Sequence, residues 1–268
     1  MAALSLPAGS DSPPDLLVIC GPTAAGKTAL AVALAAELDL VVINADSRQI
    51  YRGFDIGTAK PTAAERQRVP HRCIDLAEPV TRFTAYAWAA AAEEAITAAH
   101  RDGRTPVVVG GAGFYIRALV HPVSEQAPAG AERHAAHYLV TDPGPVLRER
   151  IADRAARMLD GGWAEEVAAL ARHVRDDAPA WQASGYSAIR EYVAGTMARD
   201  AALAQVVIAT RQYAKRQRTW FRHQLPAKRT TRLDPDDASA VGAAVAWVRD
   251  HSSSRQPRTT QSRERIPA

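Results

Sequence analysis

The sequence has little cysteine and no long apolar run, and both absences exclude classes of protein. Its 268 residues include 2 cysteines, Cys20 and Cys73, which form no metal-ligand spacing and no disulfide framework. This usage fits a reducing compartment, so we expect a cytoplasmic protein. No stretch reaches about 18 uninterrupted apolar residues, so no membrane span is predicted. Residues 1–14 lack a basic region followed by an apolar block, which indicates a disordered tail and no signal peptide.

Acidic residues are missing from one part of the chain. The formal charge is +4 and the isoelectric point is near 9.3, but residues 210–230 contain seven Lys or Arg and no Asp or Glu. Within them Arg211, Lys215, Arg218 and Arg222 recur at spacings of four, three and four, which makes one stripe on a helix. A solvated face and a contact with an RNA backbone both remain open.

A complete phosphate-binding motif lies near the start of the chain. GPTAAGKT at residues 21–28 matches G-x-x-x-x-G-K-[ST] between an apolar strand-like run and a helix-forming run. The glycines let successive N–H groups point at one anion, Lys27 adds a charge, and the Thr28 hydroxyl can hold Mg²⁺, the expected cofactor. The motif alone favours a nucleotide such as ATP. The predicted phosphate site consists of Gly21, Pro22, Thr23, Ala24, Ala25, Gly26, Lys27 and Thr28.

Buried strands that alternate with helices predict an α/β fold, a P-loop NTPase-like parallel sheet flanked by helices with a C-terminal helical part. Three strands end in Gly21, in Asp46 and in Gly110–Gly111, and ligands bind at such carboxyl ends, so these stretches should meet in one crevice. We expect residues 15–230 to form the core and 231–268 an extension that is largely disordered beyond 250. The expected strands are 15–21, 40–46, 71–76, 105–111 and 138–141, and the expected helices are 27–38, 84–101, 145–159, 163–174 and 202–225.

Asp46 is the first candidate for chemistry, because it ends a buried strand near the phosphate loop. It could hold Mg²⁺ through water, act as a general base, or only cap the next helix. Ser47, Arg48 and Gln49 add donors and acceptors beside it that suit the reading of a base edge.

Arginines gather on the predicted helix 145–159. Arg150, Arg154 and Arg157 are spaced i, i+4, i+7 and therefore share a face. If the reaction displaces pyrophosphate, such side chains are needed to stabilise the leaving charge. The same spacing is also typical of an ordinary surface face.

The motifs together resemble those of the bacterial tRNA dimethylallyltransferases, also called tRNA isopentenyltransferases. They follow the family order from about residue 15 to residue 225, and the second and last are long and specific. The motifs are GPTAAGKT (21–28), NADSRQIYRGFDIGTAKPT (44–62), VPHRCIDL (69–76), PVVVGGAGFYIRAL (106–119), RMLDGGWAEEVAAL (157–170), SGY (184–186) and TRQYAKRQRTWFR (210–222).

The resemblance implies transfer of a dimethylallyl group from dimethylallyl diphosphate to N6 of adenosine 37 in tRNAs, with release of diphosphate. The phosphate loop would then hold the prenyl diphosphate, although it looks like an ATP site. By position, Thr23 and Asp46 resemble the family's pair at the acceptor amine, with Asp46 as general base, and Arg154 resembles the arginine that stabilises the diphosphate. Expected partners are this diphosphate and the tRNA anticodon stem-loop, bound by a monomer. The positions similar to tRNA contacts of the family are Asp46, Ser47, Arg48, Gln49, Ala112 and Arg133.

Two departures from the family pattern keep alternatives open. Ala112 stands where the family usually has Thr, and several dozen residues are missing between about Ala131 and Tyr138. In the family that segment forms a helical insertion domain that grips the anticodon stem-loop. The alternatives are an adenylate isopentenyltransferase that makes free cytokinin-like nucleotides and a P-loop small-molecule kinase that uses ATP. The basic 210–222 stretch favours tRNA, because a nucleotide acceptor needs no such helix.

Overall fold

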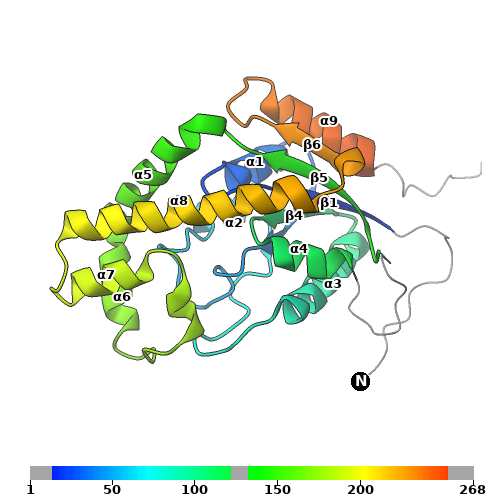
Figure 1. The fold of residues 1–268 in the computed structure, drawn as a ribbon. Coiled ribbons are helices and arrows are strands. Elements are labelled where there is room, and N and C mark those ends of the chain that lie inside the picture. Colours follow the sequence, from blue (N-terminus) through cyan, green and yellow to red (C-terminus); the bar gives the residue numbers. More distant parts are fainter. Residues whose placement is uncertain (1–13, 122–131, 253–268) are drawn as a thin grey trace, which may run out of the picture.

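Six parallel strands form a single sheet in the computed structural model, which describes residues 14–121 and 132–252 (Figure 1). Their order across the sheet is β3-β2-β4-β1-β5-β6, and every neighbouring pair is parallel. The predicted parallel α/β sheet is therefore confirmed. The strands are β1 (Asp15–Cys20), β2 (Leu40–Ala45), β3 (His71–Arg72), β4 (Thr105–Gly110), β5 (Ala135–Thr141) and β6 (Thr230–Leu233).

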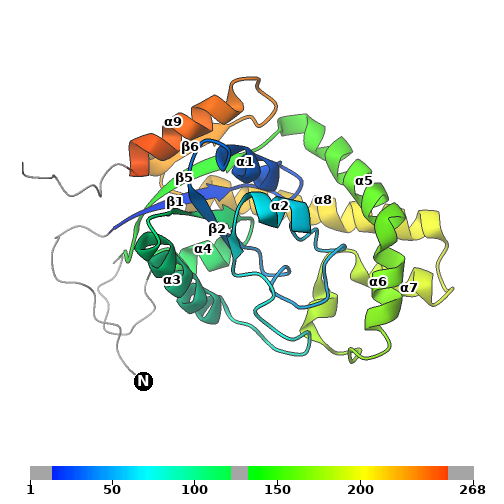
Figure 2. The ribbon, with the colours of Figure 1, turned by 180° about the vertical axis from the view of Figure 1, so that it is seen from behind.

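Helices cover both faces of the sheet and also build a separate lobe beside its carboxyl edge (Figures 1 and 2). Those around the sheet are α1 (Lys27–Leu34), α2 (Ala63–Arg68), α3 (Ala85–Arg101), α4 (Gly113–Val120) and α9 (Ala240–Ser252). The lobe contains α5 (Leu147–Met158), α6 (Ala164–Leu170), α7 (Tyr186–Val193) and the long α8 (Arg199–Gln224), which reaches back across the sheet. A kinked segment over Leu159–Trp163, in which Gly162 has a left-handed φ of 100°, joins α5 to α6.

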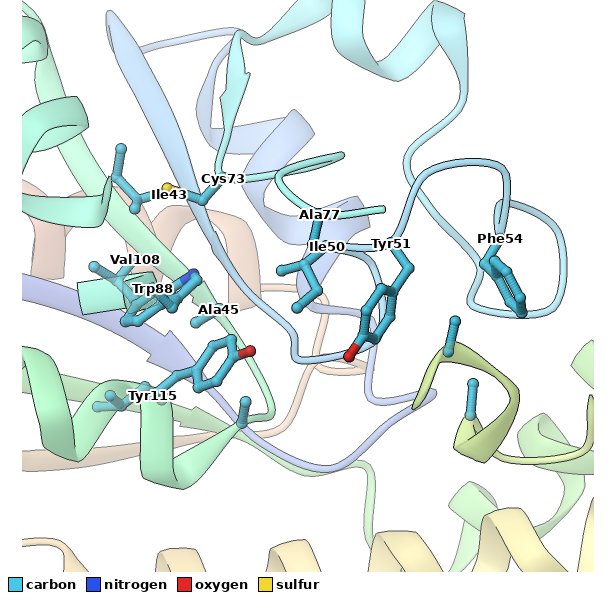
Figure 3. Close-up of a cluster of buried hydrophobic side chains, with 14 of the residues drawn as sticks. Ile43, Ala45, Ile50, Tyr51, Phe54, Cys73, Ala77, Trp88, Val108 and Tyr115 are labelled. Atoms are coloured by element: carbon cyan, nitrogen blue, oxygen red, sulfur yellow. The ribbon is translucent and has the colours of Figure 1, made fainter. Parts of the chain in front are cut away.

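The central strands are apolar throughout because both faces of the sheet are covered. In β1, Leu17 and Ile19 pack with α1 and α9, while the alternate residues Leu16 and Val18 pack with α3 and α4. Figure 3 shows part of the hydrophobic cluster between the sheet and helices α3 and α4. In this cluster the ring of Trp88 stacks on that of Tyr115, with centroids 4.9 Å apart. This packing fixes the strand ends on which the candidate site is built.

Several predicted boundaries shift for local physical reasons. The strand expected over 71–76 stops at Arg72, because Cys73 and Asp75 have left-handed φ values of 61° and 57° that no strand accommodates. The helix expected over 27–38 ends at Leu34, and the one expected over 202–225 begins earlier, at Arg199.

The C-terminal extension expected from residue 231 is part of the same fold as far as Ser252. Strand β6 adds to the edge of the sheet beside β5, and α9 packs on α1 and β1. Of the tails predicted to be disordered, 1–14 and beyond 250, residues 1–13 and 253–268 lie outside the described residues, as do residues 122–131. Within residues 14–121 and 132–252, no helix is both long and apolar enough to cross a bilayer.

Candidate active site

The phosphate loop leaves the carboxyl end of β1 and curls into the start of α1. Gly21 has a φ of 148°, and a Cβ there would lie 2.2 Å from the carbonyl oxygen of Thr141, so no side chain fits. Gly26 has a left-handed φ of 79° and begins α1. The predicted strand, loop and helix are thus all present, and two of the motif glycines are required by the path of the backbone.

Lys27 lies inside the loop and is held by its carbonyl groups. Its Nζ donates to the backbone oxygens of Gly21 at 3.0 Å and of Pro22 at 2.7 Å. Burial lowers the pKa of Lys27 from 10.5 to about 8; Asp46 opposes this shift and Arg154 adds to it. A buried ammonium with so few anionic neighbours favours the arrival of an anion.

The three strand ends meet in one large cavity of about 1010 Å³. Its walls come from the phosphate loop, from the ends of β2 and β4, from the loop before α2 and from α5. The convergence predicted from the sequence is therefore confirmed. Lining residues include Thr23, Ala24, Ala25, Gly26, Lys27, Thr28, Asp46, Gln49, Gly110, Gly111, Arg150, Arg154 and Arg157.

Arg154 connects helix α5 with the phosphate loop. Its Nη1 donates to Thr23 Oγ1 at 3.3 Å. Burial lowers the pKa of Arg154, Asp46 counteracts that shift, and Arg157 adds to it. Arg157 and Arg150 face the same cavity, as their spacing predicted, but Arg150 also pairs with Asp236.

Asp46 lines the cavity with Thr23 and Arg154, and the helix-capping role considered for it is wrong, because residues 47–50 form a turn and the next helix, α2, is capped by Thr62. One carboxylate oxygen, Oδ1, accepts the Arg48 N–H at 2.8 Å and so stabilises the turn after β2. Asp46, Thr23 and Arg154 also line a second cavity of about 70 Å³. The remaining walls of this smaller cavity are mostly apolar and include Ile151, Ala155, Met158, Trp163, Ala183 and Val206.

Helix α8 contributes two residues for which the sequence predicts no functional role. Tyr213 lines the smaller cavity, and burial raises its pKa, as does Asp46, whereas Arg48 opposes the shift. Gln217 is only 6% exposed; it accepts the Thr23 N–H at 2.8 Å and donates to the Gly111 carbonyl at 3.0 Å. The available signal was periodicity, because both residues continue the buried stripe of Val206 and Thr210.

The loop before α2 is held in place by a carboxylate of α6. Glu166 accepts backbone N–H groups of Asp55 at 2.8 Å and of Ile56 at 2.6 Å. It also accepts the Tyr186 hydroxyl at 2.7 Å. Lys60, nearly buried, binds Asp55 and Asp75 and closes the other side of the same loop. The long motif at 44–62 is thus partly a structural wall of the cavity.

The predicted tRNA-contact residues are only partly brought together. Arg48 lines the smaller cavity, while the Gln49 side-chain amide is buried and donates to the carbonyls of Thr58 and Ala59. Ser47 is half-buried, and the buried Ala112 donates its N–H to the Ala45 carbonyl at 3.0 Å.

Arg133 lies away from this group. It precedes β5 and donates its N–H to the Val120 carbonyl at the end of α4, so it stands at the amino edge of the parallel sheet, opposite the phosphate loop. Its guanidinium lies 3.5 Å from a carboxylate oxygen of Glu93. The structure does not bring Arg133 to the site.

The basic stripe on α8 is not free of acids, contrary to the sequence-based expectation. Arg218 forms a bidentate pair with Asp142, at 2.9 and 2.5 Å, and also donates to the Gly144 carbonyl. The compensating carboxylate of Asp142 follows β5 and lies 76 residues away in the sequence. The charge pattern of the helix alone therefore does not reveal this pairing. Arg211, Lys215 and Arg222 remain exposed.

Comparisons with known proteins agree with this geometry. The family model described as "IPP transferase" matches residues 49–138 and 121–224. A tRNA dimethylallyltransferase of Cyanothece sp. is 36% identical over 86% of this chain and 96% of its own length. The tRNA isopentenylpyrophosphate transferase of Bacillus halodurans has a TM-score of 0.77 at 28% identity, covering 88% of this chain and 96% of that one. The corresponding Staphylococcus epidermidis enzyme gives 0.78 at 25% identity, covering 91% and 100%. The chain therefore belongs to the IPP transferase family.

Proposed function

We propose that the protein transfers a dimethylallyl group from dimethylallyl diphosphate to N6 of adenosine 37 in tRNAs and releases diphosphate. The names of its relatives support tRNA prenylation. The observation that carries the proposal is the meeting of two cavities at Thr23, Asp46 and Arg154 beside a complete phosphate loop. Such a junction can hold a diphosphate and an acceptor base in reach of each other.

The charges divide the chemistry between the two sides of the junction. Lys27, Arg154 and the N–H groups of the loop surround the diphosphate and stabilise the charge that grows on it as the C1–O bond breaks. The N6–C1 bond forms at the same carbon, and the bonding electrons of C1–O leave with the diphosphate. Asp46 accepts the N6 proton, because it is the carboxylate shared by both cavities. The Thr23 hydroxyl, oriented by Arg154, positions the amine.

The donor set also fits Mg²⁺. Mg²⁺ in phosphate sites keeps several waters and takes few protein ligands, and the Thr28 hydroxyl and the Asp46 carboxylate line the same cavity as the loop. The described residues contain no cluster of three or more His, Cys, Asp or Glu suited to a metal, and a magnesium held mainly by phosphate needs none. Mg²⁺ there would neutralise charge on the diphosphate, with Thr28 as its direct protein ligand.

Recognition of tRNA without the insertion domain is the second part of the proposal. The alignment with the Cyanothece enzyme extends over 290 residues yet covers 86% of this 268-residue chain, which supports a missing segment of several dozen residues. Arg48 lines the smaller cavity, and Lys215 and Arg222 are exposed on α8, the helix whose Tyr213 lines that cavity. We propose that the RNA backbone contacts α8 and the turn at Arg48.

A single assay separates the candidates. The protein and Mg²⁺ are incubated with labelled dimethylallyl diphosphate and either anticodon stem-loop RNA or AMP. Label in RNA, lost when position 37 is changed to guanosine, is the expected result. Label in AMP alone would indicate an adenylate isopentenyltransferase. Steady ATP consumption without label transfer would indicate a kinase.

The general base is tested with a matched pair of variants. Asp46→Ala should abolish transfer and leave binding of the diphosphate within a fewfold of the wild type. Asp153→Ala, on the exposed side of α5, should transfer normally. Normal transfer by Asp46→Ala would remove Asp46 from the mechanism.

A further inference from the structure

Gln217 is the most deeply buried polar side chain that α8 sends to the site, with 6% exposure. Two of its hydrogen bonds fix the orientation of the amide, because the Thr23 N–H can only donate and the Gly111 carbonyl can only accept. The second contact depends on a glycine: a Cβ on residue 111 would lie 2.2 Å from Gln217 Nε2. Glycine at position 111 therefore leaves the space that the Gln217 side chain needs.

The bond to Thr23 acts on one particular peptide group of the phosphate loop. The Pro22 carbonyl and the Thr23 N–H belong to the same planar unit. Lys27 donates to the carbonyl at 2.7 Å, and Gln217 accepts from the N–H at 2.8 Å. This peptide is thus held at both ends, from inside the loop and from helix α8.

We propose that Gln217 is a positioning residue for the transfer reaction, which holds the Pro22–Thr23 peptide so that the Thr23 hydroxyl faces the reacting groups. The inference rests on the proposed function. When a diphosphate enters, the ammonium of Lys27 is drawn from the two carbonyls toward the phosphate. Gln217 then still holds the N–H of this peptide at 2.8 Å, and the carbonyl keeps only a long bond from the Ala25 N–H at 3.4 Å, while the other N–H groups of the loop bind the anion.

This arrangement separates binding from chemistry. Thr23 N–H is already engaged by Gln217 and adds nothing to the anion site, so its release does not weaken diphosphate binding. The Thr23 hydroxyl lies 3.3 Å from Arg154 Nη1, and rotation of the peptide would move it. Misplacement of a positioning group by about 1 Å reduces turnover on the order of 100-fold.

The test compares Gln217→Met, similar in size but unable to hold either partner, with Gln212→Met at an exposed position of the same helix. For Gln217→Met we expect kcat to fall on the order of 100-fold with KM for dimethylallyl diphosphate within about threefold of wild type. Gln212→Met should match the wild type. An unchanged kcat, or a loss that resides in KM, would overturn the proposal.

A second readout needs no turnover and so separates this inference from the proposed function. Hydrogen exchange of the unliganded protein should show the Thr23 amide exchanging at least about tenfold faster in Gln217→Met, with the β4 amides unchanged. Gln217→Glu keeps an oxygen for this N–H and should retain the protection, although the Gly111 carbonyl then loses its donor. If Gln217→Met does not fold, Gln217→Glu provides the test. A folded Gln217→Glu whose Thr23 amide is unprotected would refute the proposal that Gln217 holds the Pro22–Thr23 peptide. Absence of prenyl transfer by the wild type would refute the function alone.

Discussion

The pKa of Lys27 provides a quantitative prediction for diphosphate binding. Burial lowers that pKa from 10.5 to about 8 in the free protein, so the side chain loses its charge as the pH rises through 8. A bound diphosphate supplies the missing negative partner and should return the pKa to its ordinary value or above. Between pH 7 and pH 9.5 the neutral fraction of free Lys27 rises from about a tenth to nearly all, so binding should weaken about 30-fold.

The assay is calorimetric titration of dimethylallyl diphosphate without divalent metal at pH 7 and pH 9.5, in buffers of different ionisation enthalpy. We expect uptake of close to one proton on binding at pH 9.5 and much less at pH 7. Lys27→Met is the control: it should bind weakly at both pH values and lose this 30-fold difference. Equal proton uptake by wild type and Lys27→Met would refute the reasoning.

The lowered pKa of Lys27 affects diphosphate binding and folding stability in opposite directions as the pH rises. An unfolded lysine keeps its proton up to about pH 10.5, while folded Lys27 keeps it only to about 8. The unfolded chain therefore binds more protons in this interval, and the free energy of unfolding gains a contribution that grows with pH. Lys27→Met should remove that contribution and stabilise the free protein at neutral pH, as measured by urea unfolding.

Three further predictions concern Arg154, Gly57 and Arg218. Arg154→Gln should lower kcat/KM by about 100- to 1000-fold in steady-state transfer assays, since it loses charge beside the leaving group, while Arg148→Gln, exposed on the same helix, should not. Gly57→Ala should destabilise by about 1–3 kcal/mol in chemical denaturation, because its Cβ would meet an indole 2.1 Å away; Gly161→Ala, with nothing within 4 Å, should cost little. Arg218→Gln should lower the midpoint of thermal unfolding yet leave the salt dependence of RNA binding nearly unchanged, because its charge is already paired.

Local patterns predicted the sheet and the phosphate loop because the forces that form them act along the chain. Apolar runs ending in glycine or aspartate specify buried parallel strands, and GPTAAGKT specifies the loop between one strand and one helix. Asp46 was identified by its motif, and Arg154 by its helical spacing and the family resemblance; the structure places both beside Thr23.

The missed features depend on contacts between distant segments. Gln217 joins α8 to the loop across 194 residues, and a single glutamine in a helical pattern gives no sign of such a partner. Glu166 holds a loop about 110 residues earlier in the chain. The pairing of Arg218 with Asp142 removes one charge from the predicted basic stripe for the same reason. Charge patterns along one helix do not show which charges the fold neutralises.

The position of the predicted deletion bears on whether a compact chain can keep the chemistry. Helix α4 runs from the carboxyl edge of the sheet to its amino edge, where the Val120 carbonyl accepts the Arg133 N–H just before β5 begins. The predicted deletion falls in this connection, at the edge opposite the phosphate loop. Its loss removes none of Thr23, Asp46 and Arg154, and it leaves the contacts of α8 with the loop intact. The deletion should therefore raise the RNA concentration that the enzyme needs, while the rate of transfer from a bound RNA depends on parts of the fold that are all present.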